Sequence, residues 1–418
     1  MFNIKLHKYQ SLKETIKSMV KLLTFFFLIF STAYGQKESK FVTLNTFNPE
    51  AESSDLLLVD SVFNESKLIG IGECTHGTSE FTPMRYRIFK YLVETKGFNT
   101  IFIEADYSAC LRLNRYINGE NDNVDKAILE LRYFAWTTEE MKRFVEWMRD
   151  FNHNSNNKIQ IVGCDMQSIS DDKIEIDRIM GVKNHTDSLP DFFHTLKHPY
   201  QDTSAARQAL NDWNIFYNNY LIGVEPNNSF LINTTINQFL QHKLNRSYQY
   251  NYRDSCMAIN ILSHLDRNPN SKGIWMAHNS HISKTRYDYP TNYSYKTSGQ
   301  FLSKKLGKEY LSIAQTTNYG YFNAWKYIKK KPVFSVCEIK KAKGNSLEKY
   351  LSQYNTKILF CDFSKIPNIS KMKYTEIGHT YGKTNSDYKH KRYKKLQEGK
   401  FDYVIYFEKT KQTTILSK

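Results

Sequence analysis

Short apolar runs recur along this chain and alternate with segments whose apolar residues have helical spacing. The runs are four or five residues long, rich in β-branched and aromatic residues, and mostly uninterrupted by polar residues. Strands of this composition are buried on both faces, as in a parallel sheet that helices cover. Strands are therefore expected at 68–72, 100–103, 159–162, 273–276, 310–313, 357–361 and 403–407.

The segments between these strands predict an α/β architecture, with a mostly parallel sheet flanked by helices. Residues 80–96 carry apolar side chains close to helical spacing, and 125–133 and 138–151 have the same character. From about 170 to 267 the strand-like runs stop, and we interpret this stretch as a helical insertion. Its clearest helices are expected at 204–220, 229–244 and 250–265.

Four of the expected strands run directly into residues that are able to do chemistry. In open α/β sheets, ligands bind just beyond the carboxyl ends of the strands. Taken singly, an Asp or Glu after a strand also fits a helix cap, and a His also fits an ordinary packed or solvated residue. The coincidence at four strands favours one functional site. Its residues are expected to be Glu73 and His76, Glu104, Asp165, and the pair His278 and His281.

The segment after the first of these strands is the most specific. Glu73 precedes His76 by three residues, so its carboxylate is able to hydrogen-bond the imidazole, define its tautomer and raise the basicity of the far nitrogen. Gly77 allows a sharp turn before the next helix. Arg85 on that helix is expected to pair with a carboxylate or to hold a developing oxyanion.

A histidine pair follows the fourth of these strands, at His278 and His281, with Asn279 beside the first. Two imidazoles at this spacing suit acid–base partners or metal ligands. A metal site would use His76, His278 and His281 together with nearby carboxylates. The chain has no HExxH or CxxC motif, so a divalent metal is the second interpretation of this cluster.

Segments 70–81 and 277–281 resemble the two histidine signatures of the erythromycin esterase family. The first segment, Gly-Ile-Gly-Glu-Cys-Thr-His-Gly-Thr-Ser-Glu-Phe, fits the pattern Gly-Glu-x-x-His-Gly-x-x-Glu-Phe. The second, Ala-His-Asn-Ser-His, fits the pattern His-Asn-x-His. Segments 163–167 and 298–302 fit the family as well, and the resemblance covers roughly residues 40–410.

The resemblance implies a hydrolase that opens an ester or a macrolide lactone, a reaction associated with antibiotic resistance. By position, it implies that His76 is the general base that activates water and that Glu73 is its neighbour. The other expected site residues are Arg85, Glu104, His278 and His281 for catalysis, and Asp165 and Asn279 for substrate binding.

Three hypotheses follow for the function. The first is hydrolysis of a small-molecule carboxylic ester or lactone without metal or other cofactor. The chain has no Gly-x-Ser-x-Gly elbow, which argues against a serine nucleophile. The second is metal-assisted hydrolysis at the same cluster. The third is a binding protein that holds a metal or haem there without hydrolysis.

The N-terminal segment has the layout of a secretory signal peptide: basic residues, then the apolar run 22–30, then small residues. A signal peptide at 1–35, cleaved after Gly35, predicts an exported protein, periplasmic or secreted, with its α/β domain at 36–418. An uncleaved N-terminal anchor is the alternative, and Met19 is an alternative start. No stable membrane insertion is expected after removal of the signal peptide.

The net charge is +16, and the sequence pI is about 9.3. Lys and Arg are spread along the chain, with denser runs at 326–343 and 389–400, and no nucleic-acid motif accompanies them. The charge predicts a solvated basic surface and no nucleic-acid partner, with an anionic substrate or a negatively charged envelope surface as the alternative. Six widely spaced cysteines predict buried free thiols instead of disulfides.

Overall fold

The computed structural model describes residues 41–181, 203–244, 249–288, 294–383, 389–390 and 392–417. Residues 42–418 form one compact unit. The expected signal peptide at 1–35, and with it the domain start at 36, lies outside the described residues.

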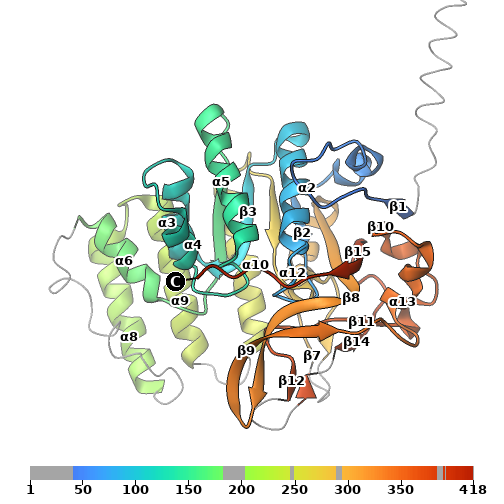
Figure 1. Cartoon of the computed structure of the whole chain (residues 1–418). Helices are drawn as coiled ribbons and strands as arrows, with labels where there is room; N and C mark the ends of the chain where they lie inside the picture. The colour runs from blue at the N-terminus through green and yellow to red at the C-terminus, as the bar shows by residue number, and fades with distance from the viewer. Residues whose placement is uncertain are drawn as a thin grey trace, which may run out of the picture. The chain divides into compact units, whose positions relative to one another are not determined.

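One mixed sheet runs through the compact unit (Figure 1). Across the sheet, the strands are β1 (Phe41–Thr43), β10 (Ile358–Asp362), β15 (Tyr403–Thr410), β8 (Tyr310–Ile328), β2 (Leu68–Ile71), β5 (Gly273–Met276), β3 (Thr100–Asp106) and β4 (Gln160–Asp165). From β15 to β4 every neighbouring pair is parallel. β10 is antiparallel to β15, and β9 (Lys331–Ile339) is antiparallel to the far part of β8. The expected strands and the mostly parallel sheet are confirmed.

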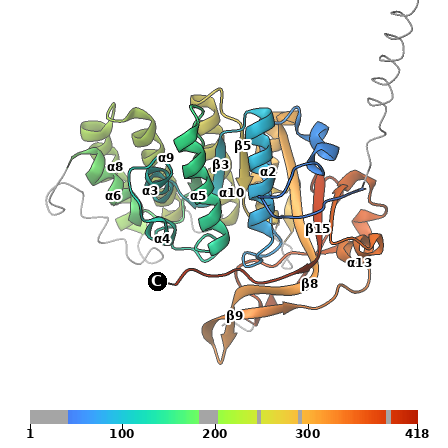
Figure 2. The same ribbon diagram turned by 45° about the horizontal axis from the view of Figure 1, so that its top comes forward.

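Helices cover both faces of this sheet (Figures 1 and 2). Ile103 of β3 belongs to the apolar core on one face of the sheet. The preceding residue, Phe102, points to the opposite face, where its ring centroid lies 5.3 Å from that of His264. His264 belongs to α10 (Gln249–Arg267), against which α12 (Ser298–Leu306) packs. Because neighbours in a strand point to opposite faces, burial on both sides requires continuous apolar runs. The first face carries α2 (Phe81–Lys96), α3 (Tyr107–Ile117) and α5 (Glu139–Asn154).

Between 170 and 267, the described residues form helices and connecting turns. The helices expected at 204–220, 229–244 and 250–265 are present. In Figure 1, α6, α8 and α9 stand together at the left, on the side of β3 away from β2. That this stretch is an insertion stays a prediction. Its elements are α6 (Ser170–Ile179), α8 (Thr203–Phe216) followed by a π-helical turn (Tyr217–Leu221), α9 (Pro226–Leu244) and α10.

One strand and one helix differ from the expectation, and both differences affect the surroundings of His76. The strand expected at 310–313 is the start of the 19-residue strand β8, which leaves the sheet and returns as β9. The helix expected at 125–133 is shorter, because α4 (Val124–Leu129) ends four residues early and Arg132 takes a φ of 57°. The chain after α4 instead brings Tyr133 and Phe134 beside His76.

All six cysteines are free and buried, as expected.

The remaining elements are short. They include the 3₁₀ helix η1 (Leu56–Phe63), α11 (Asn279–Ile282) and α13 (Leu347–Leu351), and the paired strands β6 (Tyr287–Asp288) with β7 (Ser294–Tyr295), β11 (Lys373–Thr375) with β14 (Tyr393–Lys395), and β12 (Gly382–Lys383) with β13 (Lys389–His390).

Among the helices that the structure describes, none has the length and apolar character needed to cross a membrane.

Gly163 in β4 tests how closely β3 and β4 pack. A Cβ atom at this position would lie 2.3 Å from the backbone oxygen of Asp106, which forces the two strands apart. We expect Gly163→Ala to lower the free energy of unfolding by about 1–3 kcal/mol, measured by urea denaturation. Gly378→Ala is the matched control, because an added Cβ there meets no atom within 4 Å. Equal losses in the two variants would contradict this account of the packing.

Candidate functional site

The expected site residues follow strands that end at one edge of the sheet. β2 and β3 both pair with β5 in the same register, so the residues after their ends start from neighbouring positions. The ring centroids of His76 and His278 are 5.0 Å apart, and a Glu104 oxygen lies 3.5 Å from Nε2 of His281. The structure thus brings together Glu73, His76, Glu104, His278 and His281, all of them buried.

Glu73 is held between His76 and Arg85. Its Oε1 accepts a hydrogen bond from Nδ1 of His76 at 2.7 Å, and its Oε2 accepts one from Nη1 of Arg85 at 2.8 Å. Arg85 is fully buried and also donates to the backbone carbonyls of Ile71 and Ala277, both at 2.9 Å. A guanidinium with donors committed on three sides is rigid, so the carboxylate that orients His76 is itself held in place.

The far nitrogen of His76 is open. The carboxylate partner assigns the ring proton to Nδ1, which leaves the lone pair of a neutral imidazole on Nε2. The described part of the chain provides no hydrogen bond to that nitrogen, and 8% of the residue remains exposed. The lone pair is therefore available to a water or a ligand.

His278 is held in its neutral form. Burial, followed by the neighbouring rings of His76 and His281, keeps the pKa of His278 well below its usual range. Its Nε2 lies 3.1 Å from the carbonyl oxygen of Ile377, and its Nδ1 lies 2.8 Å from the hydroxyl of Ser280. Because a carbonyl only accepts, Nε2 carries the proton and Nδ1 is the acceptor. Both nitrogens are thus used within the protein.

His281 carries a positive charge. Burial acts to lower its pKa, but Asp254 and Glu104 raise the pKa of His281 to about 10. Its Nδ1 lies 2.9 Å from Oδ1 of Asp254, an oxygen that also accepts from the backbone nitrogen and hydroxyl of Ser298. Burial likewise acts to raise the pKa of Glu104, but His281 and Arg253 hold that pKa well below its usual range. Glu104 and His281 therefore form a buried ion pair.

Arg253 of α10 completes this network, and the sequence pattern does not reveal it. Its Nη2 donates to Glu104 and to Asp165, both at 2.6 Å, and its Nη1 lies 3.3 Å from Nε2 of His281. The positive charges of Arg253 and His281 are balanced by three carboxylates, those of Glu104, Asp165 and Asp254. An Arg-Asp pair on an amphipathic helix is the only sequence signal, and solvated pairs look the same. Asp165 is engaged by Arg253, and its expected substrate contact stays a prediction.

Tyr133 and Phe134 form an aromatic side of the site that the sequence pattern also does not reveal. Their ring centroids lie 5.5 and 6.4 Å from that of His76, and Phe134 is 5.0 Å from Phe334 of β9. Burial raises the pKa of Tyr133 well above its usual range, and neighbouring carboxylates, led by Glu104, add to this. The phenol therefore keeps its proton and is a hydrogen-bond donor within the site.

Asn279 has a structural contact where substrate binding was expected. It is fully buried, its amide nitrogen donates to the carbonyl of Gln315 at 2.9 Å, and its oxygen accepts from the nitrogen of Gln315 at 3.3 Å. These two bonds tie the turn after β5 to β8. A substrate contact of Asn279 stays a prediction.

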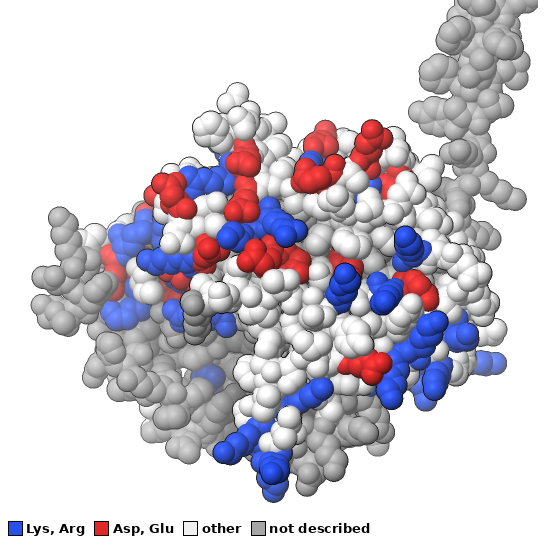
Figure 3. Space-filling model, viewed as in Figure 1, with Lys and Arg blue, Asp and Glu red and all other residues white. Residues whose placement is uncertain are grey.

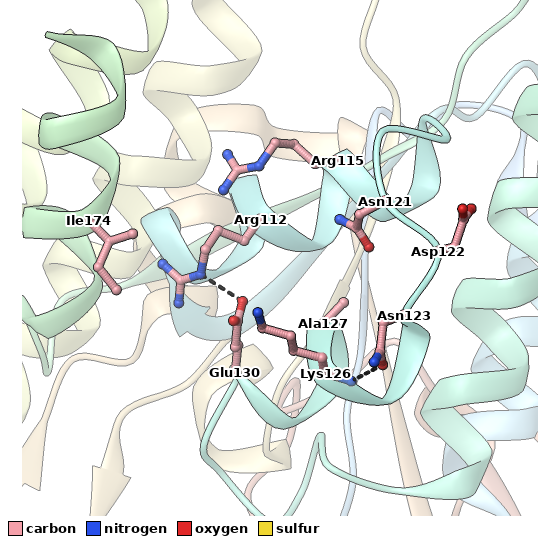
Figure 4. A pocket seen from close by; sticks show the side chains of 9 residues that line it. All are labelled: Arg112, Arg115, Asn121, Asp122, Asn123, Lys126, Ala127, Glu130 and Ile174. Atoms are coloured by element: carbon pink, nitrogen blue, oxygen red, sulfur yellow. Dashed lines mark hydrogen bonds and ion pairs between the residues drawn. The ribbon is translucent and has the colours of Figure 1, made fainter. Parts of the chain in front are cut away.

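A separate hollow of about 540 Å³ lies between α3, α4 and α6 (Figure 4). Arg112 and Glu130 form an ion pair at its wall, with Nε 2.8 Å from Oε2. Its lining contains no member of the histidine cluster. The hollow is lined by Arg112, Arg115, Asn121, Asp122, Asn123, Lys126, Ala127, Glu130 and Ile174.

The sequence model of the family described as erythromycin esterase matches residues 93–221 and 228–410. The chain belongs to the erythromycin esterase family. It is similar to the type II erythromycin esterase of Escherichia coli, with 23% identity over 380 residues that cover 79% of this chain and 88% of that protein. The type I enzyme of Escherichia coli is also 23% identical, over 300 residues that cover 62% of this chain and 72% of that protein. Membership of the erythromycin esterase family implies a hydrolase.

Solved structures share the fold. A Bacillus cereus protein superposes with a TM-score of 0.75 at 22% identity, covering 91% of this chain and 97% of its own. A mutant of the erythromycin esterase EreC in its open conformation superposes with a TM-score of 0.69 at 18% identity, covering 91% of this chain and all of its own. These likenesses confirm the α/β fold class.

The erythromycin esterase family model covers only some of the site residues. It includes Glu104, Asp165, His278 and His281, whereas Glu73, His76 and Arg85 precede its first residue at 93. The assignment of Glu73, His76 and Arg85 to the site therefore rests on the signature residues of this segment and on the contacts described above.

The histidines expected to bind a metal are mostly engaged within the protein in this structure. Both nitrogens of His278 are used within the protein, and His281 is a cation between two carboxylates. Of the three histidines expected to bind metal, only His76 keeps an open nitrogen lone pair, which metal ligation requires. Among the described residues, no group of three or more His, Cys, Asp or Glu is arranged to hold a metal ion.

The ion pair of His281 predicts a pH dependence of stability. Its pKa is raised from the ordinary value of 6.5 to about 10, so its contribution is complete below about pH 6.5 and is lost as the pH rises toward 10. We expect the free energy of unfolding to fall over this window more steeply in the wild type than in His281→Asn, measured by urea denaturation at several pH values. The exposed His153→Asn is the control. An NMR titration of His281 with a midpoint near 6.5 would contradict the ion pair.

Proposed function

We propose that this chain hydrolyses a carboxylic ester or lactone with a water molecule that His76 activates. The observation that carries the proposal is the open Nε2 of His76, opposite an Nδ1 that Glu73 holds at 2.7 Å. Glu73 in turn is held by the buried Arg85. A histidine oriented by a carboxylate, with its other nitrogen open to accept a proton, is the arrangement of a general base.

In the proposed reaction, His76 is the only protein group that accepts and donates a proton. The water oxygen attacks the carbonyl carbon while Nε2 of His76 takes one water proton, and the resulting imidazolium is stabilised by Glu73. The bond between the carbonyl carbon and the leaving oxygen then breaks, and that oxygen takes the proton from Nε2. The products are a carboxylic acid and an alcohol, or one hydroxy acid if a lactone is opened.

One donor of the site suits the negative charge that develops on the carbonyl oxygen. The phenol of Tyr133 keeps its proton and packs beside His76. His281 is not such a donor, because Asp254 and Glu104 engage its nitrogens. Donors placed before the reaction lower the barrier without reorganisation, and each typically contributes about 10²–10³-fold in rate.

The proposed reaction needs no metal. The nitrogens of His278 and His281 are committed to hydrogen bonds and an ion pair, as described above. A metal site built on His76, His278 and His281 together would need some of these nitrogens to be released.

A macrolide lactone is the proposed substrate class. The family and its Escherichia coli relatives support it, at 23% identity. The aromatic side formed by Tyr133, Phe134 and Phe334 supports a large apolar ligand, because such walls bury ligand surface in small-molecule sites. We also propose that the chain is exported, on the strength of the basic, apolar and small-residue order before residue 36.

His76→Ala tests the general base directly. We expect the wild type to hydrolyse erythromycin or a member of an aryl-ester panel, and the variant to lose about 10²–10⁴-fold in kcat. His153→Ala, at an exposed position of α5, is the matched control. Each reaction is followed by product formation with and without a chelator. Full activity of His76→Ala would overturn the proposal, and loss of wild-type activity with the chelator would favour the metal-assisted alternative.

Tyr133→Phe tests the proposed oxyanion donor. Removal of one hydroxyl should lower kcat by about 10²-fold with little change in KM, because the bond forms mainly in the transition state. Tyr321→Phe, on an exposed tyrosine of β8, is the control. An unchanged kcat, or a change confined to KM, would leave Tyr133 as part of the wall and not of the chemistry.

A further inference from the structure

The β8–β9 hairpin exposes apolar side chains where it leaves the sheet. Figures 1 and 2 both show it extending away from the other strands. Ile328 is 55% exposed, Val333 38% and Trp325 37%. Side chains of this size are usually buried, and single exposed examples are common, but a group on one projecting ribbon points to a binding surface.

Both faces of the hairpin are apolar. In the pairing of β8 with β9, Trp325 lies opposite Phe334, whereas Ile328 and Val333 belong to the residues of the other face. A flat protein partner would cover one face only. A medium that surrounds the tip on all sides would cover both.

The turn of the hairpin is basic. Lys329 and Lys330 form the turn with positive φ angles of 49° and 64°, and Lys331 begins β9, all three exposed. No Asp or Glu occurs from residue 310 to residue 337. In Figure 3, Lys and Arg side chains gather at the lower end of the view, where Figure 1 places this turn, with no acidic side chain beside them.

We propose that the tip of the β8–β9 hairpin docks on the surface of an anionic lipid bilayer. Trp and Tyr side chains favour the bilayer interface, aliphatic side chains enter its outer apolar layer, and lysines attract anionic headgroups. A nucleic acid would use the lysines but would leave Ile328 and Val333 exposed. The docking is peripheral, because it places only the tip of a hairpin in the interface.

Docking would also bring the aromatic side of the site toward the bilayer. Phe334 of the hairpin packs on Phe134, which packs beside His76. An apolar substrate dissolved in the bilayer would then meet the aromatic side of the site first. This consequence depends on the proposed function, whereas the docking itself does not.

Vesicle co-sedimentation of the full chain tests the docking, with no use of activity. The vesicles contain phosphatidylcholine alone or phosphatidylcholine with phosphatidylglycerol. Each lysine near an anionic surface strengthens binding by about fivefold, so Lys329→Gln/Lys330→Gln/Lys331→Gln should weaken binding to anionic vesicles on the order of 100-fold. Lys304→Gln/Lys305→Gln/Lys308→Gln removes the same charge from exposed positions of α12 and the turn after it, and should bind as the wild type.

The apolar part of the docking has its own variant. Ile328→Ser/Val333→Ser should weaken vesicle binding at least tenfold, whereas Leu57→Ser/Leu58→Ser, at exposed positions of η1, should not. The N-terminal segment is the same in every variant, so its own affinity for lipid cancels in these comparisons. Vesicles should also shift the tryptophan emission of the wild type, and Trp325→Phe should abolish that shift.

Three results would overturn the docking. Equal binding of the wild type to neutral and anionic vesicles would remove the role of the lysines. Equal losses in the hairpin and α12 lysine variants would assign binding to the overall charge of +16. An unchanged Ile328→Ser/Val333→Ser variant would exclude entry of the hairpin into the bilayer and would favour a soluble anionic partner.

Discussion

The site depends on one buried cation. Arg85 comes from the first half of α2, yet its guanidinium reaches the carbonyl that ends β2, the carbonyl that follows β5, and the carboxylate of Glu73. Arg85 is fully buried, and a buried charge is tolerated only where hydrogen bonds and an opposite charge replace its hydration shell. Arg85 meets that condition by joining the two strand ends from which the histidines emerge. Its loss would leave Glu73 buried without its partner and would free the orientation of His76.

Three histidines within one small space have three different states, because each has different neighbours. His76 faces one carboxylate and keeps an open nitrogen. His278 faces a carbonyl and a hydroxyl, and burial keeps it neutral. His281 lies between two carboxylates and is a cation. Imidazole titrates near neutral pH, so modest differences in environment are enough to separate these roles.

The long strand β8 connects the sheet to the surface. Its first part lies between β2 and β15, next to the strand that leads to His76, and its far part forms the exposed hairpin with β9. Phe334 and Phe134 link the hairpin back to the site. The sheet core and the exposed tip are thus continuous along one strand.

The sequence by itself determined the class of fold and most of the cluster. Uninterrupted apolar runs require burial on both faces, and parallel strands bring their carboxyl ends to one edge, so Glu73, His76, Glu104, His278 and His281 followed from local pattern. The tertiary structure alone decided which residues join them. Arg253 lies on a segment that looks like any amphipathic helix, and Tyr133 lies at the end of a segment whose pattern predicts a helix. The contact of the Asn279 amide with Gln315 has no local signal either. The protonation states of the histidines also depend on neighbours that are distant in sequence, and no local pattern encodes those distances.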